Sequence, residues 1–139
     1  MLNFLAALLA LARTPAPATP DFVGLATWYG EPYIGALMRN GEPLASDGMT
    51  CAVDASRWPW LAGKVLVVSV PGRDDVELTV TDTGQLERAG QFVFDASRQT
   101  WRPADAGVQV VIDVPAETYQ RLFAEDGDTR LVSVWVKGE

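Results

Sequence analysis

The sequence predicts a small closed β-barrel with a single helix. Five short runs rich in β-branched and aromatic residues are separated by turn residues, and one stretch near the C-terminus has helical spacing. The length of 139 residues and the hydrophobic share of 48% fit one compact domain with a real core. We therefore expect one domain over residues 21–139, preceded by a separate segment over residues 1–20.

Turn and helix signals separate the predicted strands. Residues 71–75, Pro-Gly-Arg-Asp-Asp, join two strands as a hairpin turn, and Gly127 precedes the last strand. Pro115 stands where a first-turn proline is tolerated, and apolar side chains follow it at helical spacing before the helix ends at Ala-Glu-Asp-Gly-Asp. The strands are predicted over residues 23–29, 64–70, 76–81, 108–114 and 131–137.

Residues 1–20 have the pattern of a targeting segment. Residues 4–12 are apolar but too few to span a bilayer, a Pro-rich stretch follows Arg13, and Ala16 and Ala18 offer an AxA-like cleavage site. This pattern favours a secretory signal peptide, so we expect an exported protein of the periplasm or cell envelope. The alternative is a short helix that packs on the domain or on a partner, followed by a semi-rigid linker.

The composition excludes several classes of function. There is no histidine, which excludes Ser/His and Cys/His nucleophile pairs and His-ligated zinc. The net charge of -7 disfavours nucleic acid as a partner. The single Cys51 forms no internal disulfide, and we expect it to be buried and structural. No metal-ligand pattern is present in the sequence, so we expect neither metal nor cofactor, and catalysis would rest on carboxylates.

Five short motifs follow one another along the chain. They are GLATWYG at 24–30, RNGEP at 39–43, GMTCAVD at 48–54, VTDTG at 80–84 and VIDVPAETYQRLF at 111–123. In this order they resemble the RlpA-like double-psi β-barrel family, whose motifs read approximately ASWYG, ANGE, GMTAAH, DRGP, and IDLS before a helix and a last strand. They are similar also to the barrels of MltA-type transglycosylases and 3D-domain proteins. The resemblance implies an all-β, six-stranded double-psi β-barrel with one short helix.

The resemblance also implies a lytic transglycosylase, which cleaves the glycan strands of peptidoglycan without water and leaves 1,6-anhydro ends. In such enzymes one aspartate protonates the glycosidic oxygen and then accepts a proton from the sugar's 6-hydroxyl, and Asp82 holds the matching position. Burial and nearby carboxylates keep such an acid protonated near neutral pH. Asp54 and Asp113 are the expected neighbours, although Asp54 stands where many family members have histidine. An Asp before Thr-Gly is also typical of a simple turn.

One aligned position of the family has two candidates in this chain. Asp113 interrupts an apolar run, and Asp95 lies in the similar segment Phe-Asp-Ala-Ser. We prefer Asp113, because only this residue is followed by the expected helix and last strand. Residues 85–107 then form an insertion, whose alternating pattern predicts an extra hairpin beside the site. We expect the insertion to line a substrate groove or to bind a partner.

Aromatic side chains are candidates for stacking on sugars, because a pyranose ring has an apolar face. We expect Tyr29 and Trp101 to be exposed for this purpose, and Trp28, Trp58 and Trp60 to pack in the core.

Polar and small residues are the other candidates for substrate binding. Asn40 and Glu42 are suited to hydrogen bonds with sugar hydroxyls, although Asn-Gly is also an ordinary turn signal. Gly84 lacks a Cβ atom and so allows a polysaccharide to approach the backbone next to Thr83.

Two other classes of function remain open from the sequence. The first is a non-catalytic barrel that binds glycan or serves as a structural component of a cell envelope or a virion, with protein partners at the N-terminus or at residues 85–107. The second is a retropepsin-like aspartic protease, which Asp-Thr-Gly at 82–84 also resembles. Its triplet lies too late in the chain for that family, and the expected later apolar element is missing.

Overall fold

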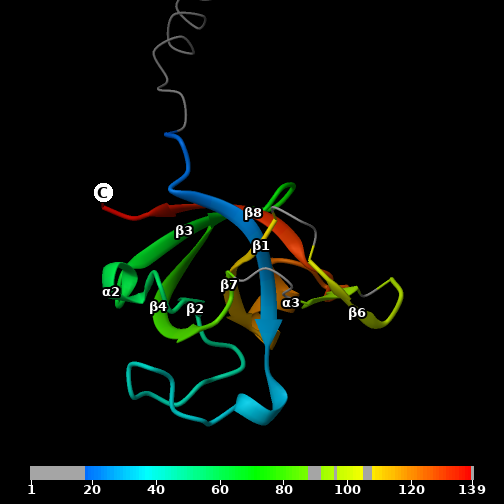
Figure 1. The fold of residues 1–139 in the computed structure, drawn as a ribbon, viewed down its shortest axis with the longest axis horizontal. Coiled ribbons are helices and arrows are strands. Elements are labelled where there is room, and N and C mark those ends of the chain that lie inside the picture. Colours follow the sequence, from blue (N-terminus) through cyan, green and yellow to red (C-terminus); the bar gives the residue numbers. More distant parts are fainter. Residues whose placement is uncertain (1–17, 88–91, 96, 105–107, 139) are drawn as a thin grey trace, which may run out of the picture.

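The computed structural model describes residues 18–87, 92–95, 97–104 and 108–138 (Figure 1). Most of the targeting segment that the sequence predicts therefore lies outside the described residues. The elements in chain order are β1 (Phe22–Tyr29), η1 (Glu31–Tyr33), β2 (Thr50–Asp54), α2 (Trp58–Leu61), β3 (Val65–Ser69), β4 (Val76–Gly84), β5 (Phe92–Asp95), β6 (Thr100–Pro103), β7 (Val110–Pro115), α3 (Ala116–Leu122) and β8 (Arg130–Val136).

Six strands close into a barrel in the order β1-β7-β2-β4-β3-β8. β1 runs parallel to β7 and β2 runs parallel to β4, whereas the other neighbouring pairs are antiparallel. Two parallel pairs that meet through the antiparallel β2–β7 contact fit the double-psi arrangement. The predicted all-β class and the small six-stranded barrel are confirmed.

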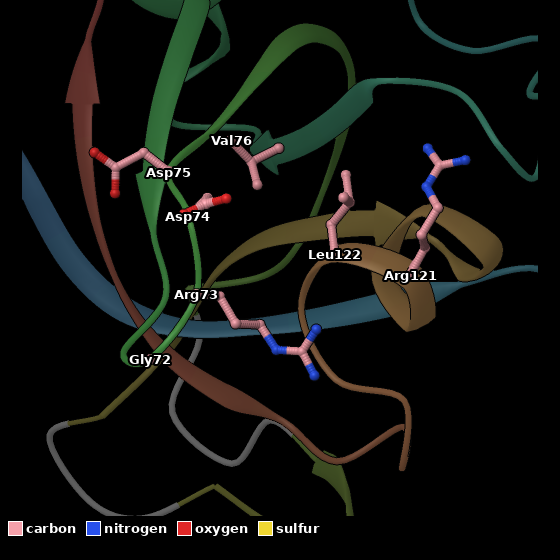
Figure 2. A pocket seen from close by; sticks show the side chains of 7 residues that line it. All are labelled: Gly72, Arg73, Asp74, Asp75, Val76, Arg121 and Leu122. Atoms are coloured by element: carbon pink, nitrogen blue, oxygen red, sulfur yellow. The ribbon is translucent and has the colours of Figure 1, made fainter.

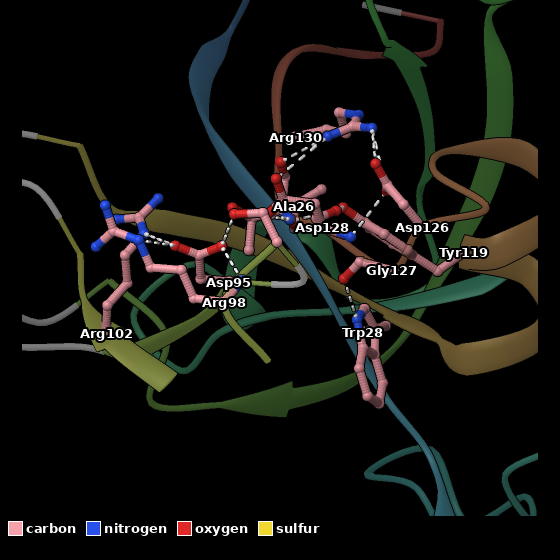
Figure 3. Close-up of polar contacts among 12 residues, drawn as sticks. Ala26, Trp28, Asp95, Arg98, Arg102, Tyr119, Asp126, Gly127, Asp128 and Arg130 are labelled. Carbon is pink, nitrogen blue, oxygen red and sulfur yellow. Dashed lines mark hydrogen bonds and ion pairs between the residues drawn. The ribbon is translucent and has the colours of Figure 1, made fainter. Parts of the chain in front are cut away.

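The barrel interior is filled by the β-branched and leucine side chains that the strand runs supply. Along β3 and β8, inward residues such as Leu66, Val68 and Val134 are fully buried and alternate with more accessible neighbours. α3 packs against β1 and β7 and adds Tyr119, whose ring stacks on Phe123 at 5.1 Å between centroids. The Tyr119 hydroxyl lies 3.1 Å from the carbonyl oxygen of Ala26 and 2.5 Å from that of Asp128 (Figure 3).

The hairpin predicted within residues 85–107 is present as a separate two-stranded sheet of β5 and β6. Its turn is held by Asp95, which accepts hydrogen bonds from Ser97 Oγ at 2.6 Å and from the Arg98 amide at 3.2 Å. The guanidinium groups of Arg98 and Arg102 also lie within 4 Å of the same carboxylate (Figure 3). Asp95 therefore serves the turn of the hairpin, and Asp113 is the aspartate followed by α3 and β8.

Several local expectations need refinement. β2 forms over residues that the strand prediction omitted, and the short helix α2 forms in addition to the predicted helix, which is α3. The turn at 71–75 forms as expected, with Gly72 at a φ of 80°, in the left-handed region that glycine adopts without strain. Cys51 is fully buried, as predicted. No helix among the described residues is both long enough and apolar enough to span a membrane.

Candidate functional site

Two aspartates from different strands face each other across β2. Ala52 of β2 is paired in register with Asp82 on the parallel strand β4 and with Asp113 on the antiparallel strand β7. Neighbouring strands lie about 4.8 Å apart, so the two aspartate backbones are separated by two strand spacings, roughly 10 Å. The small Ala52 side chain leaves the space between the two carboxyl groups open.

Both carboxyl groups open into one cavity of about 230 Å³, which we call the aspartate pocket. The hydroxyl groups of Tyr29 and Thr83 are buried there, and neither has a hydrogen-bond partner among the described residues. Buried polar groups are nearly always paired with protein or ordered water, so two unpaired hydroxyls beside two carboxyl groups indicate a place for ordered water or for a polar ligand that displaces it. The pocket is lined by Tyr29, Tyr33, Ala36, Leu37, Leu44, Ala52, Asp82, Thr83, Gly84, Leu86 and Asp113.

Asp113 has the properties of an acid that stays protonated near neutral pH. Burial raises the pKa of its carboxyl group from 3.8 to about 7, a hydrogen bond from Thr27 opposes this rise, and the nearby charge of Asp82 adds to it. Thr27 lies on the neighbouring strand β1, and its Oγ1 donates that hydrogen bond to Asp113 Oδ1 at a distance of 3.0 Å. Burial also raises the pKa of Tyr29, with smaller contributions from the two aspartates, so its phenol is a donor at neutral pH.

Asp82 is fixed by backbone amides. Its Oδ1 accepts hydrogen bonds from the amides of Arg39 and Thr83, both at 2.9 Å. The bond to Thr83 is the turn-like contact that an Asp-Thr-Gly sequence favours, and the bond to Arg39 attaches the loop between η1 and β2 to the end of β4. Within the described part of the chain, Asp82 Oδ2 accepts no hydrogen bond, which leaves it available to a ligand.

Asp54 lies outside the aspartate pocket and holds a loop instead. Its Oδ1 accepts hydrogen bonds from the amides of Leu86 at 2.8 Å and Glu87 at 2.9 Å, and its Oδ2 accepts from the amide and hydroxyl of Ser56. Partial burial acts to raise the pKa of Asp54, but these hydrogen bonds outweigh it and lower the pKa to about 2. Asp54 is thus suited to positioning Leu86, which lines the pocket, rather than to donating a proton.

Other predicted binding residues are divided between the pocket and the surface. Thr83 and Gly84 line the aspartate pocket, and a Cβ atom at Gly84 would meet only the Leu86 side chain at 3.5 Å. Asn40 and Glu42 are exposed and line neither cavity beside the aspartates. The side-chain oxygen of Asn40, Oδ1, accepts a hydrogen bond from the backbone amide of Glu42 at 3.0 Å, which is the turn contact that the Asn-Gly pair also predicts.

A larger cavity of about 800 Å³ adjoins the aspartate pocket, and we call it the aromatic groove. The two cavities share Tyr29, Tyr33, Leu86 and Asp113. The aromatic groove is lined by Thr27, Trp28, Tyr29, Gly30, Pro32, Tyr33, Ile34, Ser46, Leu86, Phe92, Trp101, Val110, Asp113, Ala116, Glu117 and Gln120. Its volume lies within the usual range of about 300–1,000 Å³ for ligand sites.

The tryptophans differ in part from their expected positions. Trp101 is 58% exposed in the aromatic groove, as predicted, whereas Tyr29 is only partly exposed. Trp28 and Trp58 are partly buried against the core. Trp60 was expected in the core but is 76% exposed on α2, because this helix is a single turn at the barrel surface.

The sequence pattern omitted three residues that complete the site. Thr27 precedes Tyr29 by two positions on β1, so the period of a strand places both on one face and would have indicated it. Ala52 was not identified because its place between the aspartates depends on strand register. Phe92 lies on β5 two residues before Phe94, so the alternation of a strand places both rings on one face and would have indicated Phe92.

A separate cavity of about 560 Å³ lies between the β3–β4 turn and α3 (Figure 2). It has no lining residue in common with the aspartate pocket or the aromatic groove. Over the described residues, no three His, Cys, Asp or Glu side chains are grouped as metal ligands.

The fold and the site define a small six-stranded β-barrel protein with two aspartates in one pocket. No protein-family model matches the chain, and no curated protein sequence matches it. Among solved structures, the crystal structure of an apo expansin from Clavibacter michiganensis is similar, with a TM-score of 0.49 and 16% sequence identity. The match covers 82% of this chain and 48% of the expansin chain, so this chain spans about half the length of that protein.

Proposed function

We propose that the protein is a lytic transglycosylase that cleaves the glycan strands of peptidoglycan with Asp82 and Asp113. The observation that carries the proposal is the shared aspartate pocket, in which burial raises the pKa of Asp113 to about 7 while Asp82 is fixed by two amides. One carboxyl group then holds a proton at neutral pH and the other is oriented to accept one. The motif resemblance supplies the substrate class.

The proposed reaction transfers one proton from the protein to the sugar and one proton from the sugar to the protein, and it uses no water. The carboxylic acid of Asp113 protonates the glycosidic oxygen, and the bond from that oxygen to C1 breaks. The C6 hydroxyl of the same sugar forms a new bond to C1, and its proton passes to the carboxylate of Asp82. When the products leave, this proton returns to Asp113. The family resemblance alone would assign both transfers to Asp82, and the burial of Asp113 is the reason for dividing them.

The in-chain pairing of the two aspartates also bears on the protease alternative. A retropepsin-like enzyme needs a second copy of its Asp-Thr-Gly triplet so that two aspartates share a proton. Here the second aspartate of the pocket is Asp113, which lies in Ile-Asp-Val-Pro and not in a second Asp-Thr-Gly triplet. We therefore favour glycan chemistry over peptide hydrolysis.

The test is digestion of purified peptidoglycan, intact and stripped of stem peptides, followed by mass spectrometry of the soluble products. We expect anhydro-ended products from the wild-type protein, and at least a hundredfold less from Asp113→Asn and from Asp82→Asn. Asp75→Asn is the matched control, because Asp75 is an exposed carboxylate outside the aspartate pocket. Absence of products from the wild type, with binding to sacculi retained, would support the non-catalytic envelope or virion barrel instead.

We propose further that the protein is exported to the periplasm or cell envelope, where its substrate lies. The motivation is the apolar stretch and the AxA-like site within residues 1–20. N-terminal sequencing of the protein recovered from the cell envelope tests this location, and recovery only from the cytosol with an intact Met1 would contradict it.

A further inference from the structure

We propose that Phe92 and Trp101 on the inserted hairpin form a platform that binds one uncharged N-acetylhexosamine ring of the glycan, beside the aspartate pair. The assignment of this ring to a peptidoglycan strand rests on the proposed function. The platform itself rests on the geometry of β5 and β6, which no motif of the resembling family supplies. The two parts are tested by different measurements.

The two rings present a large apolar surface to the aromatic groove. Phe92 is 57% exposed and Trp101 is 58% exposed, although both line the groove. Phe94 is the cross-strand partner of Trp101, so Phe92, Phe94 and Trp101 lie on one face of the hairpin. Val93 points to the other face and is fully buried, so the aromatic face is the open one.

The platform is held in place by the contacts of Phe94 beside it and by the contacts at its turn. Phe94 packs against Trp101 with ring centroids 5.5 Å apart and meets the Trp28 ring edge-on at 5.9 Å. Trp28 Nε1 in turn donates a hydrogen bond of 2.8 Å to the Gly127 carbonyl oxygen of the barrel (Figure 3). At the turn, Asp95 holds the amide of Arg98 and the two neighbouring guanidinium groups. Rings fixed in this way lose little entropy when a ligand binds.

The polar residues of the groove lining define the chemistry of the ligand. Ser46, Glu117 and Gln120 line the same groove as the platform and supply hydroxyl, carboxylate and amide groups that match the hydroxyl and acetamido groups of a sugar. No Lys or Arg is found among the groove-lining side chains that the structure describes, whereas Asp113 and Glu117 are acidic. A negatively charged ring would lie close to these carboxyl groups without a cationic partner. An apolar platform in a groove that is also lined by neutral and acidic polar groups therefore favours an uncharged amino sugar.

Continuity with the aspartate pocket places this ring on the same glycan strand as the bond to be cleaved. Tyr29, Tyr33, Leu86 and Asp113 line both cavities, so a strand that reaches Asp113 continues directly along the aromatic groove. The expected role of the hairpin is to hold the sugar adjacent to the cleavage point.

The experiment is calorimetric titration of the full chain with the linear tetramer of N-acetylglucosamine. Trp101→Ala is expected to lower the association constant for the tetramer by about tenfold, which is the effect of losing one well-packed aromatic face. Trp60→Ala is the matched control, because Trp60 is also an exposed tryptophan, 76% accessible, and lines neither cavity beside the aspartates. Thermal unfolding of both variants checks that each remains folded.

Two results would overturn the platform. The first is equal binding by Trp101→Ala and the wild type, and the second is equal binding of an anionic trimer of galacturonic acid and the neutral tetramer by the wild type. Because the titration needs no cleavage, it separates the two proposals. Binding that depends on Trp101 together with no product from sacculi would retain the platform and reject the transglycosylase. Product from sacculi together with binding that does not depend on Trp101 would retain the transglycosylase and reject the platform.

Discussion

Replacing Asp113 by asparagine should stabilise the protein at high pH while it abolishes activity. Burial raises the pKa of this carboxyl group from 3.8 to about 7. Each pH unit between these values corresponds to about 1.4 kcal/mol of differential proton binding, so the ionised carboxylate costs about 4 kcal/mol in the folded protein. Asparagine has nearly the same shape and cannot ionise, so the variant avoids that cost.

The sign of the pH dependence follows from the same two pKa values. Below pH 3.8 the group is protonated in both the folded and the unfolded chain, and its full contribution to stability is present. Between pH 3.8 and about 7 only the folded protein holds the proton, so its stability falls by about 1.4 kcal/mol per pH unit. Above pH 7 the loss is complete. The variant should therefore match the wild type near pH 4 and exceed it by about 4 kcal/mol near pH 8.

Urea unfolding followed by tryptophan fluorescence measures this difference at a series of pH values. Asp82→Asn provides an internal check, because the charge of Asp82 contributes to the raised pKa of Asp113. Removing that charge should make the fall in stability end at a lower pH and become smaller, because only the pKa in the folded state is lowered. A free-energy difference between wild type and Asp113→Asn that stays constant from pH 4 to pH 8 would refute the reasoning, because it would mean that Asp113 titrates alike in both states.

Three further substitutions and one pH profile test the surroundings of the pair. Asp54→Ala removes an acceptor of three backbone amide bonds and should cost about 2 kcal/mol in urea unfolding; an unchanged midpoint would contradict this. Ala52→Leu should fill the space between the aspartates, cost about 1–3 kcal/mol and eliminate cleavage, and full activity would disprove the geometry. Gly24→Ala should lower the melting temperature, since its Cβ would lie 2.6 Å from the Gln109 carbonyl oxygen, and an unchanged value would argue against that contact. Glycan cleavage should decline as the pH rises through about 7, where Asp113 loses its proton; an increase over that interval would exclude it as the proton donor.

The barrel was predictable because its strands carry local signals. Short runs rich in valine mark β3 and β8 directly, and the Pro-Gly pair at 71–72 marks the hairpin turn between β3 and β4. β2 was omitted because Thr-Cys-Ala-Val-Asp is short and mixes the strand formers Thr and Val with Ala and Asp, which are depleted in strands. Its strand conformation comes from pairing with β4 and β7 on either side, which is a tertiary effect.

Asp82 was expected from the motif resemblance, whereas Asp113 was indicated by a side chain that conflicts with its surroundings. Asp113 stands out as a carboxyl group within an apolar run, and that conflict persists in the fold as a raised pKa. Asp54 gives no such signal, because the two amides on its Oδ1, those of Leu86 and Glu87, belong to residues more than thirty positions later in the chain. A sequence pattern cannot identify hydrogen-bond partners at that separation, so a loop-holding carboxylate and a catalytic one look the same.

The strand ladder fixes the spacing of the two aspartates independently of every loop. β4 and β7 are both hydrogen-bonded to β2, so the distance between Asp82 and Asp113 is set by backbone pairing. The β5–β6 hairpin pairs only within itself among the described strands, and it adds its rings from outside the barrel. A shortened or exchanged β5–β6 hairpin should therefore leave the spacing of Asp82 and Asp113 unchanged. Under the proposed function, the barrel would carry bond cleavage and the hairpin would carry substrate choice, so the two could diversify separately.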